Sequence, residues 1–386
     1  MMTLNVTHCS LTKADVICLG EVLHRNSSLD SLRVQGLSKI DHIFPLVIGL
    51  QENTSLQLLD ISSSHVTMTD FPFQCFVQIL TRIRSLKSLN ISGWTVKLEE
   101  ARSLHCLGSF LKTCTIRDLN LAGCKIFVSV EDPEKGKYDS LLETLSKGLQ
   151  PYPECEVAFL NLSGCQVIMM TSRGQVSLQA SDLIPFLSPL AKLTSLNASL
   201  KRGNDPVCKI GEKTIINFFQ SLGSKLSNLR RLTISNWSAQ IENSEKASKV
   251  IAKSLKQLDL KALTVNRLQV VDGLGQKSLS HIFLSTLLLG LPQLTYFSIK
   301  GTVMSVEEAA VVARCIAERH KGPFLDLSVR HFPPEVLKEF RAVLIASGKV
   351  FPSVIRCAAC HNEELRIELR PAQNTGVWDA FACSLK

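Results

Sequence analysis

The sequence has no apolar run long enough to cross a membrane. Its longest runs, residues 42–50 and 282–291, are about half of the roughly 20 residues that a spanning helix needs. The N-terminal stretch MMTLNVTHCSLTKAD also lacks the basic and continuous apolar segments of a secretory signal. We therefore expect an intracellular protein, cytoplasmic or nuclear and not secreted.

Signatures of catalysis are missing as well. The chain contains no G-x-S-x-G and no H-E-x-x-H motif, and the glycine-rich stretch Gly273–Ser278 lacks the G-K-S/T order of a phosphate-binding loop. We expect neither enzymatic activity nor a cofactor.

The cysteines do not suggest a disulfide framework. There are 13 of them, an odd number scattered through apolar segments, which favours reduced core thiols. Cys357, Cys360 and His361 match the C-x-x-C-H haem-attachment pattern, but that chemistry requires export. A zinc site on these three residues stays open as an alternative to incidental thiols. It would need a fourth ligand, for which Cys383 is the nearest thiol.

Short apolar segments recur along the chain with the pattern leucine–x–x–leucine–x–leucine or a close variant. The first four intervals are 28, 27, 30 and 30 residues, which indicates a repeat protein. The segments are centred at 4–6, 32–34, 59–61, 89–91, 119–121, 160–162, 196–198, 232–234, 258–260, 297–299 and 325–327.

The opening repeat, LNVTHCSLTKADVICLGEVLHRNSSLDSL, resembles the leucine-rich repeat of the ribonuclease-inhibitor subtype. Leu4, Val6, Cys9 and Leu11 occupy the strand and turn positions of that motif, and a helical pattern follows and ends near Asn26. LNLAGCKI and LNLSGCQV repeat the cysteine signature, while LNISGW and LTISNW place Trp94 and Trp237 at that inward-turning position. We interpret both tryptophans as core or turn residues.

The physical pattern agrees with this resemblance. Leucines at alternate positions make one face of each strand apolar, so that face must be covered. The amphipathic segment that follows supplies a helix that packs against it. We predict an α/β leucine-rich-repeat solenoid, a curved horseshoe with parallel strands on the concave face and helices on the convex face. It spans about eleven repeats over 1–350, with insertions near 125–157, 171–181 and 201–209, and a capping segment follows over 351–386.

The register of the repeats predicts which side chains line the concave face. The residue between the two strand leucines, and the one two positions later, point away from the core. They form polar, nearly neutral rows suited to hydrogen bonding with a protein partner, although a merely solvated face is the alternative. The predicted partner-binding residues are Arg33, Asp60, Asn90, Ser92, Asn120, Asn161, Ser163, Asn197 and Asp259.

Basic charge lies elsewhere. The net charge is +9, and residues 201–277 hold 14 Lys and Arg against 6 Asp and Glu. A basic patch of Arg230, Arg231, Lys246, Lys249, Lys253 and Lys256 could meet a nucleic acid or an acidic protein. Helical spacing puts the four lysines on one face, and a solvated lysine face is the alternative that we favour.

These observations predict a non-catalytic scaffold that binds a protein on its concave face. Solenoids normally carry a cap at each end, yet the first repeat begins at Leu4. We therefore expect a piece of a longer protein, with further domains in the parent chain, or self-association at this edge. The repeats are similar to the C-terminal region of Tonsoku-type replication-repair scaffolds, and to those of intracellular innate-immune receptors.

Overall fold

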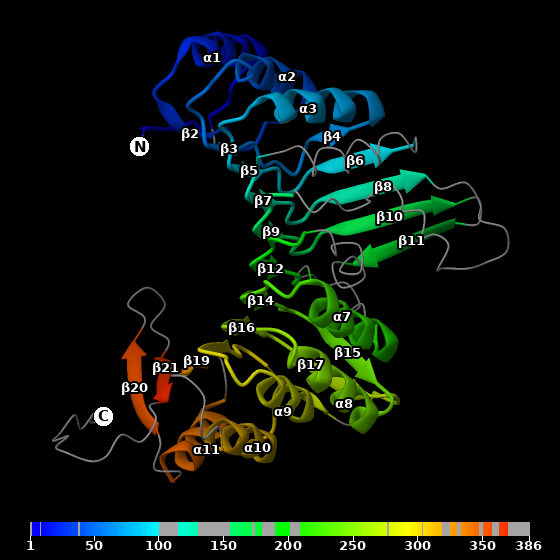
Figure 1. Cartoon of the computed structure of the whole chain (residues 1–386), viewed down its shortest axis with the longest axis vertical. Coiled ribbons are helices and arrows are strands. Elements are labelled where there is room, and N and C mark those ends of the chain that lie inside the picture. The colour runs from blue at the N-terminus through cyan, green and yellow to red at the C-terminus, as the bar shows by residue number, and fades with distance from the viewer. Residues whose placement is uncertain are drawn as a thin grey trace. The chain divides into compact units, whose positions relative to one another are not determined.

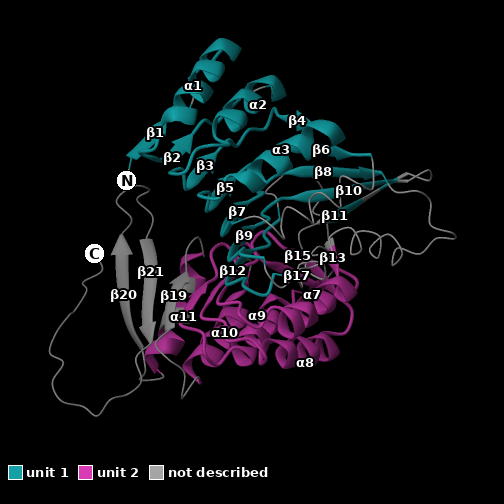
Figure 2. Ribbon diagram, turned by 45° about the horizontal axis from the view of Figure 1, so that its top comes forward, with its two compact units in different colours: residues 1–201 teal, residues 202–386 magenta. Residues whose placement is uncertain are grey.

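The structure is a computed structural model in which the chain forms two compact units, residues 1–201 and 202–386 (Figure 2). It describes residues 2–7, 9–37, 39–99, 115–129, 155–171, 174–179, 190–200, 209–275, 278–302, 304–318, 325–329, 333–346, 350–356 and 363–369.

Unit 1 is built on a sheet of parallel strands, one for each repeat (Figure 1). In spatial order these are β1 (Met2–Asn5), β2 (Leu29–Arg33), β3 (Leu58–Asp60), β5 (Ser88–Asn90), β7 (Asp118–Asn120), β9 (Phe159–Asn161) and β12 (Ser195–Asn197). Each of these strands overlaps a segment that the leucine pattern predicts.

The core of unit 1 follows directly from that pattern. Leu59, Leu89, Leu119 and Leu160 are buried and pair with one another across the strands. Burying a leucine side chain contributes about 2 kcal/mol relative to leaving it exposed. Because neither the strand nor its cover can bury these side chains alone, the repeats stabilise one another.

A tight turn follows the strand in most repeats, and it requires the left-handed backbone region. Gly93 (φ 84°), Gly123 (φ 67°) and Gly164 (φ 65°) each stand three residues after the strand's last asparagine. Glycine adopts this conformation without a Cβ penalty. The turn then directs Trp94 and Cys124 into the core, where both are buried.

Three helices cover the N-terminal repeats of unit 1, namely α1 (Lys13–Arg25), α2 (Ile40–Gly49) and α3 (Asp70–Arg82). α1 begins at a capping box in which the Thr12 side chain accepts from the Asp15 N–H and Asp15 reaches back to the Thr12 N–H. α1 and α2 approach so closely at Gly20 and Gly49 that a Cβ on Gly49 would lie 2.1 Å from the Gly20 carbonyl oxygen.

A second sheet, which the repeat pattern does not predict, runs beside the long one in unit 1 (Figure 1). Its strands are β4 (Thr67–Met68), β6 (Thr95–Leu98), β8 (Lys125–Ser129), β10 (Gln166–Thr171) and β11 (Gly174–Gln179). Alternation explains β6, because Val96 and Leu98 are buried and Lys97 is exposed. The insertion near 171–181 is the antiparallel β10–β11 hairpin. Of the other two insertions, residues 130–154 and 201–208 lie outside the described residues.

Unit 2 repeats the same design. Its main sheet contains β14 (Arg231–Thr233), β16 (Ala262–Thr264), β18 (Tyr296–Ser298) and β19 (Leu325–Val329) in parallel, followed by antiparallel β21 (Glu363–Leu369) and β20 (Val350–Arg356). A smaller parallel sheet contains β13 (Lys209–Gly211), β15 (Ser238–Ile241) and β17 (Gln269–Asp272). Its helices are α7 (Glu212–Lys225), α8 (Ser244–Leu255), α9 (Ser280–Gly290), α10 (Val306–Ala317) and α11 (Pro334–Ala346).

The predicted α/β repeat fold with a parallel sheet is therefore confirmed, whereas the horseshoe and the boundary at residue 350 stay predictions. One predicted strand is wrong. The strand expected at 258–260 is β16, four residues later, because Leu263 is the residue that pairs with Leu232 and Phe297. Leu258 and Leu260 are instead buried in the segment before it.

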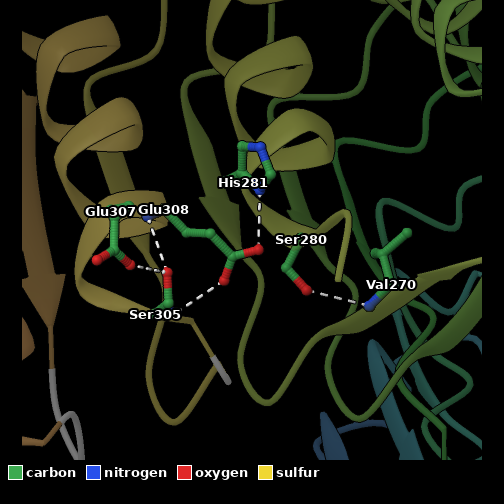
Figure 3. Close-up of polar contacts among 6 residues, drawn as sticks. All are labelled: Val270, Ser280, His281, Ser305, Glu307 and Glu308. Atoms are coloured by element: carbon green, nitrogen blue, oxygen red, sulfur yellow. Dashed lines mark hydrogen bonds and ion pairs between the residues drawn. The ribbon is translucent and has the colours of Figure 1, made fainter. Parts of the chain in front are cut away.

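Polar contacts bind α9 to its neighbours (Figure 3). His281 Nδ1 lies 2.9 Å from Glu308 Oε1 of α10, and the backbone N–H of Val270 donates to the Ser280 hydroxyl at 3.1 Å. Ser305 and Glu308 form a capping box at the start of α10. One hydroxyl of α9 has no such role: Ser285 Oγ is buried with no partner in the part of the chain that the structure describes.

This contrast predicts opposite effects for two serine-to-alanine changes in one helix. Ser285→Ala removes an unsatisfied buried hydroxyl and should stabilise the protein by about 1 kcal/mol, whereas Ser280→Ala orphans the Val270 N–H and should cost about 1–2 kcal/mol. Urea denaturation followed by circular dichroism measures both. Equal effects of the two changes would contradict this account of α9.

Candidate functional site: the strand face of unit 1

Register places one polar side chain of each repeat in line across the long sheet of unit 1. Asn90 pairs with Asn120, Asn120 with Asn161, and Asn161 with Asn197. Each asparagine is half-buried and follows a buried leucine. Because successive side chains of a strand alternate between its faces, the asparagines lie on the face opposite the leucine core. We call these four residues the asparagine row, and their face the strand face.

Each member of the asparagine row bonds to the turn that follows it. The Oδ1 atoms of Asn90, Asn120, Asn161 and Asn197 accept the backbone N–H two residues later, at 3.0, 3.0, 3.0 and 3.1 Å. In three of these bonds the donor is the backbone of Ser92, Ser163 or Ser199. Asparagine in this position therefore holds the strand–turn junction, as short polar side chains do in Asx turns.

The amide nitrogens of the row are different. Among the described residues, no group accepts a hydrogen bond from Nδ2 of Asn90, Asn120 or Asn161, whereas each Oδ1 accepts one bond from the following turn. The row therefore offers donors and few acceptors to a partner.

Two residues at the N-terminal end of the row differ from the asparagines. Arg33 and Asp60 lie at the same register position, as predicted, and Arg33 is exposed. Asp60 is only 7% exposed. Its Oδ1 accepts from the Ser62 N–H and hydroxyl, and its Oδ2 accepts from Gln35 Nε2 at 2.7 Å. The expectation that the Asp60 side chain points toward solvent is therefore wrong, since both of its carboxylate oxygens are engaged by neighbouring residues.

Two residues of the strand face are not predicted by the sequence pattern. Phe159 and Asp118 precede Asn161 and Asn120 by two positions, on the same face, and they pair with each other across β7 and β9. Phe159 is 43% exposed, which is unusual for an aromatic side chain surrounded by polar ones. Partial burial raises the pKa of the Asp118 carboxyl, and Arg117 opposes that rise. The sequence signal that could have indicated Phe159 is an apolar residue directly before a strand leucine, at a position that faces away from the core.

A cluster of cations stands just before these strands. Lys87 and Arg117 precede β5 and β7, and Lys192 precedes β12. Lys192 Nζ lies 2.5 Å from Glu156 Oε1. The hydrogen bond from Lys192, assisted by the charges of Lys192, Arg117 and Lys87, lowers the pKa of the Glu156 carboxyl. These three cations therefore share one neighbourhood, which we call the cationic edge.

The prediction that Asp259 is a partner-binding residue of the strand row is wrong, because Asp259 does not lie on the strand. Asp259 lies before β16, and Thr264 takes the position that aligns with Thr233 and Ser298. Asp259 instead pairs with Arg230 and with Lys261 Nζ, the latter at 2.7 Å. The hydrogen bond from Lys261, together with the charge of Arg230, lowers the pKa of the Asp259 carboxyl.

The structure divides the predicted basic patch. Lys246, Lys249 and Lys253 are exposed on α8, opposite the buried Ile251 and Leu255, and Lys256 follows as its C-cap. Lys249 Nζ pairs with Glu245 Oε1 at 2.5 Å. Arg230 and Arg231 belong to the strand layer, before and on β14, and Arg230 is engaged by Asp259. The lysine stripe is thus confined to one helix.

The cysteines follow their predicted environment only in part. Cys124, Cys155 and Cys165 are buried, and burial raises the pKa of all three thiols, that of Cys124 to about 11. Cys9 and Cys18 are exposed, contrary to the prediction of core thiols. Cys18 lies off the buried face of α1, which contains Val16, Gly20 and Leu23.

The candidate metal ligands Cys357, Cys360 and His361 lie outside the described residues. Within the described ranges, no group of three or more His, Cys, Asp or Glu side chains could hold a metal ion. The same part of the chain contains no helix of the length and apolarity needed to span a bilayer.

No protein-family model matches the chain. Among solved structures, it is similar to the C-terminal domain of tropomodulin from Caenorhabditis elegans, with 9% sequence identity and a TM-score of 0.28. That match covers 44% of this chain and 91% of the tropomodulin domain.

Proposed function

We propose that this protein is a non-catalytic scaffold that binds a protein partner on the strand face of unit 1. The observation that carries the proposal is the asparagine row, whose amide donors are unpartnered among the described residues and lie beside the exposed Phe159. An exposed aromatic side chain among hydrogen-bonding groups is typical of the centre of a protein interface.

The wider assignment is also a proposal. The ribonuclease-inhibitor-type repeats support a place in a larger nuclear scaffold for replication or DNA repair, of the Tonsoku type. The repeat region of an intracellular innate-immune receptor is the alternative. Both rest on sequence resemblance, and fold alone does not decide between them.

A second candidate is recognition of nucleic acid or an acidic protein by α8. The exposed stripe of Lys246, Lys249 and Lys253 favours it. Binding of that kind would weaken steeply as salt rises. The lone pairing of Lys249 with Glu245 reduces the charge available, so the strand face is the better supported site.

A pair of arginine substitutions tests the strand face. Asn90→Arg/Asn161→Arg places two large cations in the row, and Arg33 shows that this register position accommodates arginine. Partners captured from cell extract by the wild-type chain, and identified by mass spectrometry, should be lost from this variant. Lys249→Glu/Lys253→Glu should keep them.

Circular dichroism must first show that both variants are folded. A partner list unchanged by the arginine variant and emptied by the α8 variant would contradict the proposal and support the second candidate.

A further inference from the structure

The asparagine row is polarised in its hydrogen-bonding capacity. A side-chain amide has one acceptor oxygen and one donor nitrogen with two hydrogens. In Asn90, Asn120 and Asn161 the oxygen already accepts one bond from the following turn at 3.0 Å, whereas the nitrogen has no acceptor among the described residues, so the unused capacity of the row is mainly that of a donor. A complementary partner must therefore supply acceptors.

The charge near the row favours anionic acceptors. Among the described residues, Lys87, Arg117 and Lys192 of the cationic edge outnumber the two carboxylates with which they interact, Glu156 and Asp118. Hydrogen bonds to an ionised acceptor are also roughly twice as strong as those to a neutral one. Carboxylates fit this environment better than amide or hydroxyl oxygens.

The spacing of the row favours a helix over an extended strand. Neighbouring strands of a sheet lie about 4.8 Å apart, so the donors repeat at that distance. Glutamates three or four residues apart on a helix have Cβ atoms about 5–6 Å apart. In an extended chain, side chains on one face repeat at about 6.7 Å, which differs more from the spacing of the donors than the helical spacing does.

We propose that the asparagine row recognises an acidic helical segment, with carboxylates at every third or fourth residue, whose apolar side contacts Phe159. The inference rests on the proposed function, since it names the chemistry of the partner at the same strand face. The amide nitrogens donate to the carboxylates, and the cationic edge adds attraction at longer range.

An isosteric substitution tests this chemistry without removing the turn bond. Asn120→Asp/Asn161→Asp replaces each donor nitrogen by an acceptor oxygen and keeps an Oδ1 for the turn. Asp60 shows that aspartate works at this position, since its Oδ1 accepts from the Ser62 N–H at 3.1 Å. Asn26→Asp/Asn243→Asp is the matched control, because both asparagines accept backbone N–H bonds through Oδ1, neither lies on a strand, and the change in net charge is the same.

The probe is a fluorescent, alanine-based helical peptide with glutamate at every fourth position, and the measurement is fluorescence anisotropy with the full chain. Wild type and the Asn26→Asp/Asn243→Asp control should bind it alike. Asn120→Asp/Asn161→Asp should bind at least about tenfold more weakly, because two donors are lost and two like charges face the ligand. The same peptide with glutamine should bind at least about tenfold more weakly to wild type.

Several results would overturn the inference. They are no binding of the glutamate peptide to wild type, equal binding of the glutamine peptide, or unchanged affinity in the folded aspartate variant. Loss of binding in Lys249→Glu/Lys253→Glu would place the acidic ligand on α8 instead. If Asn90→Arg/Asn161→Arg abolishes capture of the cellular partner while Asn120→Asp/Asn161→Asp does not, the proposed function stands and the acidic-helix chemistry fails.

Discussion

Trp94→Ala should lower the free energy of unfolding by about 4 kcal/mol, within the range for deleting a large buried aromatic side chain. Trp94 is fully buried, its ring centroid lies 5.1 Å from that of Phe76, and its Nε1 donates to the Ile61 carbonyl at 2.9 Å. The substitution therefore leaves a cavity and an orphaned carbonyl between two repeats.

The next repeat contains an equivalent of the bond from Trp94 to the Ile61 carbonyl. Cys124 takes the position of Trp94, and its Sγ lies 3.2 Å from the Ile91 carbonyl, the equivalent of Ile61. In these two repeats the inward-turning residue thus bonds its turn to the repeat before it. Trp94→Phe keeps most of the volume and loses this bond, so it should cost only about 1–2 kcal/mol. Urea unfolding of the two variants measures the difference, and a loss below about 1 kcal/mol for Trp94→Ala would contradict a core role for the tryptophan.

Gly49→Ala should lower the free energy of unfolding by about 3 kcal/mol, the upper part of the range for overpacking. The added Cβ would lie 2.1 Å from the Gly20 carbonyl oxygen and 2.6 Å from the Gly20 Cα. Both are backbone atoms, so no side chain can rotate away, and α1 and α2 must separate. The intrinsic helix preference of alanine over glycine, about 1 kcal/mol, offsets only part of this.

Ile48→Ala is the matched control for Gly49→Ala. Ile48 precedes Gly49 in α2 and is 53% exposed, so its truncation should change stability by less than about 1 kcal/mol. Thermal unfolding followed by circular dichroism compares the two. If Gly49→Ala were as stable as Ile48→Ala, the close approach of α1 and α2 would be wrong.

The sequence predicted the asparagine row because two signals agreed. Buried leucines at alternate positions defined the strand, and the residue between them then had to face away from the core. At Asp259 the same reasoning failed, because Leu258 and Leu260 show the alternation of a strand although they precede it, and the strand contains Leu263. Only the register with Leu232 and Phe297 distinguishes the two, and register is a property of neighbouring repeats rather than of local sequence.

Other parts of the site could not be predicted for different reasons. The second sheet of unit 1 arises where the chain after the turn stays extended, whereas the repeat pattern predicts a helix as the cover of each strand. The asymmetry of the asparagines, oxygen engaged and nitrogen unpartnered among the described residues, depends on turn geometry. The cationic edge depends on the stacking of repeats, which brings Lys87, Arg117 and Lys192 from separate segments into one neighbourhood.

A photocrosslinking comparison tests the central claim, that the strand face of unit 1 binds the partner. A benzophenone amino acid replaces Phe159 on the strand face in one protein, and Phe71 of α3, which is 74% exposed, in another. Both exchanges start from an exposed phenylalanine, so each disturbs the fold little. Illumination in cell extract should attach the captured partner to position 159 and not to position 71. Attachment at position 71 alone, or at neither position, would contradict binding on the strand face.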